Sequence, residues 1–409
     1  MLKRVLCAAL AALAVAAAPA EAHHDDSLRF ATFNASLNRN FDGELVEELS
    51  TPDDPQIRNV AEIIQRVRPD VLLINEFDFD AGGEAVRLFQ RNYLSVGQNG
   101  ARPIRYDHTF VAPSNTGVPS GKDLDNNGVV DTTPGDVTYG NDSFGFGEYP
   151  GRFGMAVYSR KPIDRRGIRT FQRFRWSDMP GNLLPQPFYS PDEAAILRLS
   201  SKSHWDVPIE VSRHKTVHFL VSHPTPPVFD GPEDRNGRRN FDEIRFWADY
   251  VSWPWKSRYI YDDKGRRGGL RGKHFVIAGD QNSDPLDGDS VPGAIQQLLE
   301  HPRVNSRPAP ASPGGPEQAA LQGGANATHE SDPRFDTADF ADTAPGNLRA
   351  DYVLPDRWMR IKSSFVFWPL AADPLFRLVG LFNPALLPNG NGFPSSDHRL
   401  VAVDVKLGR

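Results

Sequence analysis

The sequence has almost no cysteine and no apolar run long enough to cross a membrane. Its one cysteine, Cys7, lies near the amino terminus, so no disulfide can form within the chain. Stability must therefore come from a hydrophobic core. The extended apolar run at 6–18 is shorter than the about 20 residues that a membrane-spanning helix needs. We therefore expect no stable membrane insertion.

The sequence also lacks an excess of positive charge. It carries 46 basic and 52 acidic residues, a formal net charge of −6. Proteins that coat nucleic acid usually present a broad basic surface, and this balance argues against one. A nuclease with a local cleft and bound cations is still compatible with an acidic protein.

Several catalytic motifs are absent from the sequence as well. There is no Gly-x-Ser-x-Gly elbow, no His-Glu-x-x-His zinc motif and no Walker phosphate loop. The chemistry of serine hydrolases, zinc proteases and nucleotide-binding loops therefore has no support in the sequence.

The first 22 residues have the pattern of a secretory signal peptide. Lys3 and Arg4 form a basic start, an apolar run follows, and 20–22 fits the small-x-small cleavage pattern. We expect cleavage after Ala22, which would also remove Cys7. The mature protein is then expected to be secreted or periplasmic.

Six short apolar runs each lie next to a polar residue of a kind that binds metals or phosphate. Such runs are typical of buried strands, and helical patterns at 57–67, 241–251 and 291–299 lie between them. This mixture indicates an α/β protein whose ligands bind where strand ends meet loops. The polar residues are Asn34, Glu76, His223, Asp280 with Asn282, Asp351, and Asp397 with His398.

Three stretches resemble loops, at 113–150, 224–239 and 303–347, because they are rich in Gly, Pro and small or polar residues. They could be linkers between domains. However, the polar strand-end residues extend across all three stretches. We therefore predict one domain over 23–409 with long surface insertions that shape the substrate cleft.

The strand-end residues indicate metal chemistry only when they are taken together. A single Asp or Asn at a strand end is more often a turn former or a helix cap. If the strands lie side by side, however, their acidic ends converge and require a cation. Oxygen ligands of this kind favour Mg²⁺ or Mn²⁺ over zinc.

The same segments resemble the motifs of the endonuclease/exonuclease/phosphatase superfamily, and they occur in the superfamily's order along nearly the whole mature chain. This superfamily includes deoxyribonucleases, abasic-site endonucleases, inositol phosphatases and bacterial sphingomyelinases. The matching segments are 32–34, 69–76, 151–159, 221–223, 279–282, 351–354 and 396–399.

The resemblance implies a four-layer sandwich of two mixed β-sheets packed face to face, with helices outside. It also implies a role for each strand-end residue. Glu76, Asn34 and Asp397 correspond to the metal-binding residues. His223, Asp280, Asn282, Asp351 and His398 correspond to the residues that hold the phosphate, activate water and protonate the leaving group.

The expected function is hydrolysis of a phosphoester by in-line attack of water, carried out by a monomer. A phosphodiesterase or nuclease is the first choice. The alternatives are a phosphomonoesterase acting on small phosphorylated molecules, a sphingomyelinase-like lipid phosphodiesterase, and a non-catalytic binding module on the same fold. The complete set of His and Asp residues argues against the last of these.

A second acidic segment could bind calcium. Asp123, Asp125, Asn127 and Asp131 follow the spacing of a calcium loop, but Pro134 occupies the twelfth position, where an EF-hand has glutamate. The segment is either a structural Ca²⁺ site within the 113–150 insertion or an Asx-rich surface turn.

Overall fold

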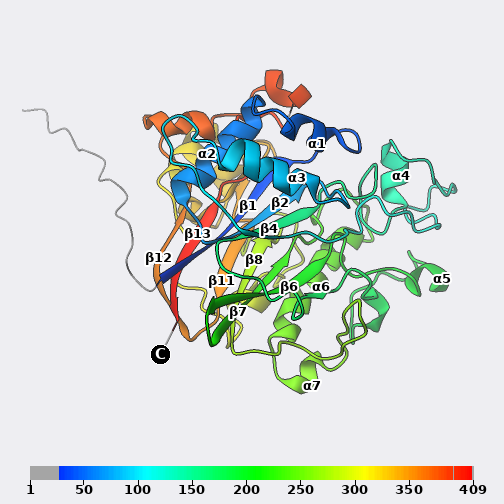
Figure 1. The fold of residues 1–409 in the computed structure, drawn as a ribbon. Coiled ribbons are helices and arrows are strands. Elements are labelled where there is room, and N and C mark those ends of the chain that lie inside the picture. Colours follow the sequence, from blue (N-terminus) through cyan, green and yellow to red (C-terminus); the bar gives the residue numbers. More distant parts are fainter. Residues whose placement is uncertain (1–26, 390, 408–409) are drawn as a thin grey trace, which may run out of the picture.

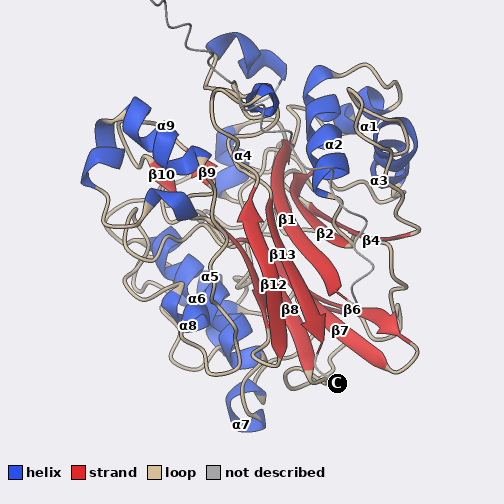
Figure 2. Cartoon of the chain, turned by 90° about the vertical axis from the view of Figure 1, so that its left-hand side faces the viewer, coloured by secondary structure: helices blue, strands red, loops and turns tan. Residues whose placement is uncertain are grey.

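Two mixed β-sheets form the centre of the molecule (Figures 1 and 2). The computed structural model describes residues 27–389 and 391–407, so the expected signal peptide lies outside the described residues. The first sheet has the strand order β12-β13-β1-β2-β4-β3 and the second β11-β8-β7-β6-β5. Within each sheet one pair is parallel, β1 with β2 and β7 with β8, and the other pairs are antiparallel.

The strands of the first sheet are β12 (Met359–Val366), β13 (Val401–Leu407), β1 (Ser27–Leu37), β2 (Val71–Phe77), β4 (Met155–Ser159) and β3 (His108–Phe110). Those of the second sheet are β11 (Asp351–Pro355), β8 (His274–Asp280), β7 (Lys215–Ser222), β6 (His204–Ser212) and β5 (Arg169–Thr170).

Helices cover the outer face of each sheet, with α1 to α3 on one side and α6 on the other (Figure 1). On the first sheet these are α1 (Glu44–Leu49), α2 (Pro55–Val67), α3 (Glu84–Leu88) and the π-helical η1 (Phe89–Leu94). On the second they are α6 (Arg235–Tyr250) and α8 (Gln296–Leu299), and α7 (Pro254–Ser257) follows α6 at the end of the molecule. The predicted four-layer sandwich is confirmed.

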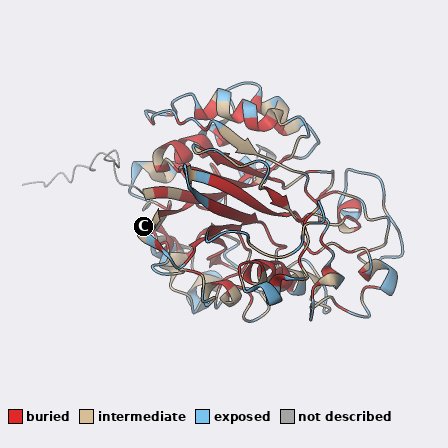
Figure 3. Ribbon diagram, turned by 60° about the horizontal axis from the view of Figure 1, so that its bottom comes forward, coloured by how far each residue is buried: buried red, intermediate tan, exposed pale blue. Residues whose placement is uncertain are grey.

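Three apolar clusters hold the layers together. One fills the space between the sheets and includes Phe30, Leu73 and Phe219, and the other two lie between each sheet and its helices. Figure 3 shows that the strands are buried along most of their length. Burial on both faces explains why the strands appear in the sequence as continuous apolar runs.

Helix α2 shows how the sequence specifies an outer layer. The Asp54 carboxylate accepts a hydrogen bond from the Ile57 N–H at 2.7 Å, and Pro55 occupies the first turn. These are the signals that start a helix. The apolar face predicted for this helix is fully buried in the cluster beneath it. None of the described helices has the length and apolar content that would let it cross a bilayer.

The other helices differ in extent from the sequence patterns. Helix α6 begins at Arg235, inside the stretch that resembles a loop, and the pattern at 291–299 yields only the four residues of α8. The 303–347 stretch holds α9 (Gly314–Gln322), η3 (Gly324–Thr328), η4 (Pro333–Phe335) and the hairpin β9 (Ala338–Asp339) and β10 (Asn347–Leu348). The remaining short elements are α4 (Val137–Asn141), η2 (Trp176–Asp178), α5 (Pro191–Ala194), η5 (Pro374–Leu378) and η6 (Pro384–Asn389).

Candidate active site

Strands from both sheets bring their polar ends to one place. In the parallel pair β1 and β2, Asn34 lies opposite Asn75, so Glu76 follows at the same edge. In the second sheet Asp351 lies directly opposite Asp280. The parallel register of β7 and β8 brings the residue after β7, His223, to this edge as well.

Asp280 is the centre of this group. Its Oδ2 accepts a hydrogen bond from Asn34 Nδ2 at 3.1 Å and lies 3.4 Å from His223 Nε2 and 3.7 Å from His398 Nε2. Its Oδ1 accepts the backbone N–H of Asn282 at 2.8 Å. Asp280 is only 1% exposed. A single carboxylate therefore connects both sheets and both histidines.

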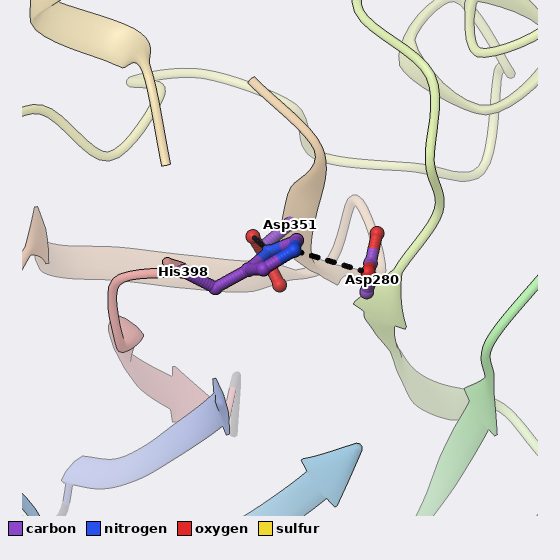
Figure 4. A group of neighbouring side chains, drawn as sticks. All are labelled: Asp280, Asp351 and His398. Carbon is purple, nitrogen blue, oxygen red and sulfur yellow. Dashed lines mark hydrogen bonds and ion pairs between the residues drawn. The ribbon is translucent and has the colours of Figure 1, made fainter. Parts of the chain in front are cut away.

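His398 is held from behind by Asp351 (Figure 4). Its Nδ1 lies 2.8 Å from Asp351 Oδ2 and donates to this carboxylate, which leaves Nε2 directed at Asp280. The Thr337 hydroxyl also donates to Asp351 Oδ2, at 2.9 Å. A carboxylate behind an imidazole fixes both its tautomer and its orientation.

Burial and mutual charge shift the protonation of these groups. Burial raises the pKa of Asp280 to about 7, although the nearby His398 opposes the shift. Burial alone would lower the pKa of His398, but Asp351 and Asp280 outweigh it and raise that pKa well above its ordinary value. Burial, together with the charges of Lys202 and His398, lowers the pKa of His223.

Glu76 and Asp397 lie beside this centre. Asn34 Nδ2 donates to Glu76 Oε1 at 2.9 Å, so a single amide contacts both Glu76 and Asp280. Glu76 has a φ of 56°, a left-handed conformation that is uncommon outside glycine and often marks functional positions. Asp397 accepts hydrogen bonds from the hydroxyls of Ser36 and Ser396 and from the Asn391 amide.

The Gly279-Asp280-x-Asn282 segment has a specific geometric requirement. A Cβ added at Gly279, where φ is 146°, would lie 2.0 Å from the Ser222 carbonyl oxygen. Only glycine lets β8 approach β7 this closely. Asn282 is also left-handed, with a φ of 49°, and its amide donates to the Pro224 carbonyl at 3.1 Å. The turn after Asp280 is thereby fixed.

The structure contains two site residues that have no clear signal in the sequence. Asn75 is fully buried, and its side-chain oxygen accepts the Asp280 N–H at 3.3 Å while its amide donates to Ser222 O at 3.4 Å. It therefore joins the two sheets beneath the site. Thr337 comes from the 303–347 stretch, and its position beside Asp351 depends on a distant part of the chain.

These residues suit a divalent cation. Carboxylates and an asparagine amide supply oxygen ligands, and ligand atoms of Asp280, Asp351 and His398 lie within 4.8 Å of one another. Asp351 Oδ1 is buried and has no hydrogen-bond partner among the described residues. A buried acceptor without a partner is costly unless a ligand satisfies it.

The acidic segment of the 113–150 insertion forms a separate group. Ligand atoms of Asp123, Asp125 and Asp142 lie within 4.8 Å of one another, and Asp142 was not expected from the loop spacing. Asp131 contacts this group through its backbone N–H, which donates to Asp142 Oδ2 at 2.7 Å, while its own carboxylate accepts from Thr138. The Asn127 side chain accepts the Val129 N–H at 2.8 Å.

Comparisons with known proteins relate the chain to one family. The model of the Endonuclease/Exonuclease/phosphatase family matches residues 31–398. A comparison with curated proteins finds no similar sequence. Among solved structures, the chain is similar to an endonuclease/exonuclease/phosphatase from Beutenbergia cavernae, with 20% identity, a TM-score of 0.49, and 93% of this chain and 72% of that one covered.

Two further structures have names that indicate a substrate. Sphingomyelinase C from Streptomyces griseocarneus has 14% identity and a TM-score of 0.43 over 92% of this chain and 99% of that one. A mannosyl-6-phosphatase from Bacteroides thetaiotaomicron has 12% identity and a TM-score of 0.43 over 93% and 100%. Such distant likenesses leave the substrate of this chain open. The family match spans nearly the whole described chain, and the protein belongs to the endonuclease/exonuclease/phosphatase family.

Proposed function

We propose that this protein is a divalent-metal-dependent phosphoester hydrolase, and first of all a phosphodiesterase or nuclease that uses in-line attack by water. Membership of a phosphoesterase family supports the reaction class. The observation that carries the proposal is the position of Asp280 Oδ2, which lies within 3.7 Å of side-chain nitrogens of Asn34, His223 and His398. A water or phosphoryl oxygen entering this group would meet a proton acceptor and several donors together.

Each residue at this centre has a role that follows from its contacts. Asp280 accepts the proton of the attacking water, and the Asn282 N–H keeps its carboxylate oriented. His398 directs Nε2 at the phosphoryl group because Asp351 binds its Nδ1. His223 approaches Asp280 from the other side and holds the phosphate or protonates the leaving oxygen.

Glu76, Asn34 and Asp397 would hold the cation, with Mg²⁺ or Mn²⁺ favoured by their oxygen ligands. When bound, the ion would supply positive charge that polarises a phosphoryl oxygen and offsets the charge that develops during attack. Asp351 Oδ1, which is buried and accepts no hydrogen bond from the described residues, supports the presence of a further ligand at this centre.

A substrate panel tests the proposal. Purified mature protein would be given plasmid DNA, RNA, bis(p-nitrophenyl) phosphate, p-nitrophenyl phosphate and sphingomyelin vesicles, with Mg²⁺ or Mn²⁺ and with EDTA. We expect metal-dependent cleavage of nucleic acid or of the soluble diester, lost with chelator and in Asp280→Ala. Turnover of the monoester alone would assign a phosphomonoesterase. Activity unaffected by EDTA would contradict the metal-dependent mechanism.

A lipid phosphodiesterase is the second candidate, because the segment before Asp397 exposes large apolar side chains. Leu381, Phe382 and Leu387 are 50–55% exposed. Asn391, which follows them, donates its amide to the Asp397 carboxylate. If lipid is the substrate, Phe382→Ser will lower turnover of sphingomyelin vesicles but not of the soluble diester. Val96→Ser, another exposed apolar position, is the control.

Export is a further part of the proposal, and it rests on the sequence pattern at 1–22. We also propose that the exported protein is a monomer. Expression of the full chain with its first 22 residues should give an extracellular or periplasmic product that begins at His23. Light scattering of that product should give the mass of one chain. An uncleaved amino terminus would contradict the export proposal without affecting the proposed chemistry.

A further inference from the structure

A cavity of about 610 Å³ lies at the end of the second sheet opposite the candidate active site, and we call it the distal cavity. Thr216 and His218 of β7 and His274 of β8 line it where these parallel strands begin. The active-site residues His223 and Asp280 lie at the other ends of the same strands. The seven residues of β8 span about 20 Å, since a strand rises about 3.3 Å per residue. The distal cavity is therefore separate from the site of the proposed reaction.

The lining of the distal cavity is strongly basic, although the chain as a whole carries a formal net charge of −6. Lys and Arg contribute five of its lining residues, His three and Asp two. The five cations are Arg169, Lys215, Arg266, Arg271 and Lys273. A cavity lined mainly by one sign of charge attracts ligands of the opposite sign. Its volume lies within the about 300–1,000 Å³ that is usual for small-ligand sites.

His218 is fixed in the wall of the distal cavity by a buried hydrogen-bond network. Its Nδ1 lies 2.7 Å from Asp206 Oδ1 and donates to it, and Asp206 Oδ2 accepts the Tyr250 hydroxyl at 2.6 Å. Arg169 in turn donates to the Tyr250 oxygen at 3.1 Å. Asp206, Tyr250 and Arg169 are at most 3% exposed. Because Asp206 binds Nδ1, Nε2 is the ring nitrogen that can meet a ligand.

Gly272 brings two of the cations next to this imidazole. A Cβ added at Gly272 would lie 2.5 Å from His218 Nε2, so only glycine lets the loop 266–273 pack so closely against the ring. Arg271 and Lys273 flank Gly272 and are exposed. The preceding part of the loop is held by Arg169, which donates to three of its backbone carbonyls at 2.7–3.0 Å. The loop therefore presents its cations at a fixed place.

The inner part of the distal cavity also keeps a positive charge. Arg169 and Arg266 both donate to the buried Asp262, at 2.9 Å and 2.7 Å, so a single carboxylate offsets two guanidinium groups. In the outer part, Arg271 donates to the Arg267 carbonyl at 3.3 Å. A guanidinium has five N–H donors, so Arg271 has further donors to offer a ligand.

A metal ion is the alternative ligand for a cavity lined by three histidines. In the part of the chain that the structure describes, three ligand atoms come within 4.8 Å of one another only in the groups at Asp280 and Asp123, so the histidines of the distal cavity do not form such a group. One of them, His274, directs its Nδ1 at Asp356 Oδ2, 3.0 Å away. The surrounding cations would also repel a metal ion. An anion fits the distal cavity better.

We propose that the distal cavity binds an anion that carries two or more phosphate groups. Arg271 and Lys273 would form charge-assisted hydrogen bonds with it, and His218 would donate from Nε2 when its imidazole is protonated. More than one phosphate is favoured because cations line both the inner and the outer part of the cavity. The same chemistry could come from a small soluble polyphosphate or from a phosphate-rich polymer. This site goes beyond the proposed function, and its ligand would leave the active site free.

Calorimetric titration with inorganic tripolyphosphate tests the proposal, with EDTA present so that the metal-dependent centre contributes little. The double variant Arg271→Ala, Lys273→Ala should bind at least about tenfold more weakly than the wild type, because it removes two charge-assisted contacts. The matched control is Lys256→Ala, Arg258→Ala. It removes the same charge from exposed positions at the neighbouring helix α7, outside the distal cavity, and should match the wild type.

Gly272→Ala tests the same site without changing its charge. It should also weaken binding, because the added Cβ would separate the loop from His218. Thermal unfolding would show that each variant is folded, and kcat/KM on the best substrate should stay at the wild-type value in all of them. Unchanged tripolyphosphate binding in both Gly272→Ala and the double variant would overturn the proposal.

Asp280→Ala separates this site from the active site, since it should bind tripolyphosphate like the wild type. Loss of binding in Asp280→Ala, or equal losses in the double variant and its control, would contradict a site in the distal cavity. So would a wild-type protein that binds neither tripolyphosphate nor long-chain polyphosphate. Binding of tripolyphosphate would identify a small anion, and binding of the long chain alone a polymer. Binding by a protein that hydrolyses no phosphoester would support this inference while contradicting the proposed function.

Discussion

Two acidic groups in this molecule have similar composition and very different surroundings. Asp280, Asp351 and His398 form one group, and Asp123, Asp125 and Asp142 form the other; in each, the ligand atoms lie within 4.8 Å of one another. All three members of the first group are buried. In the second group two of the three are partly exposed.

The two groups also satisfy their oxygens differently. In the loop, the carboxylates accept hydrogen bonds from backbone N–H groups of the same segment. The Gly128 N–H donates to Asp123 at 2.8 Å, and the Leu124 N–H donates to Asp142 at 2.8 Å. The strand-end group is assembled from positions far apart in the chain, and within the described part of the chain no group donates to its buried Asp351 Oδ1. An acidic turn whose carboxylates accept hydrogen bonds from its own backbone can be stable without a ligand. A buried acceptor without a partner is costly, so a ligand at this group would be stabilising, in agreement with the proposed metal site.

The largest expected effect comes from removing the centre of the buried group. Asp280→Ala should lower kcat/KM by about 10³-fold or more, because it removes the proton acceptor and the contact shared by three side chains. Asp123→Ala should retain nearly full activity. Steady-state kinetics on the best substrate of the panel would measure both, with circular dichroism to show that each variant is folded. Comparable losses in the two variants would remove the distinction between the groups.

Acid should lower the stability of the protein through His204, a buried histidine at the start of β6. Burial lowers the pKa of His204 to about 4, whereas an unfolded histidine titrates near 6.5. The unfolded state therefore takes up a proton first, and stability falls as the pH drops from about 6.5 to about 4, by on the order of 3 kcal/mol. Urea unfolding across this range should show a flatter pH dependence for His204→Gln. Equal slopes in both proteins would contradict the assignment.

A smaller effect is expected at the residue that supports Asp351. Thr337→Val removes the hydroxyl that donates to Asp351 Oδ2 and accepts the Asp351 N–H at 2.9 Å. We expect a loss of about tenfold in kcat with little change in KM, because the variant disturbs the orientation of His398 and not substrate binding. Thr337→Ser should recover most of the activity. If the serine variant is as poor as the valine variant, the hydroxyl is not the cause.

The smallest expected effect concerns the acidic loop. If Asp123, Asp125 and Asp142 bind Ca²⁺, millimolar Ca²⁺ should raise the Tm of the metal-free protein by about 2 °C, since a weak site adds little stability. The shift should disappear in Asp125→Asn, while catalysis stays unchanged. A Tm that does not respond to Ca²⁺ would identify the segment as a surface turn.

The sequence pattern predicted that several strand-end residues would lie together, but it did not predict the contacts around them. Each strand-end residue follows or precedes an apolar run, so the pattern alone could indicate that Asp280 and Asp351 share an edge. The pairing of these two residues across β8 and β11 agrees with that expectation. Local pattern could also predict α2, which has a clear cap and a clear apolar face.

The contacts that complete the site could not be predicted in this way. Thr337 contacts Asp351 from a stretch of low apolar content. The same composition gives no apolar periodicity that would predict helix α9. Lys202 lies in a serine-rich segment where a lysine would ordinarily face solvent. It is buried nonetheless, and its carbonyl accepts the Asn115 N–H at 2.8 Å from a distant part of the chain. Such long-range contacts leave no periodic signal in the sequence.

The most direct test of metal binding at the strand ends is anomalous diffraction from a crystal of the mature protein soaked in Mn²⁺. We expect the strongest anomalous peak at the strand ends, beside Glu76 and Asp397, with loss of that peak in Glu76→Gln. A peak only in the loop of Asp123 and Asp125, or no peak at all, would contradict a metal-dependent active site at Asp280.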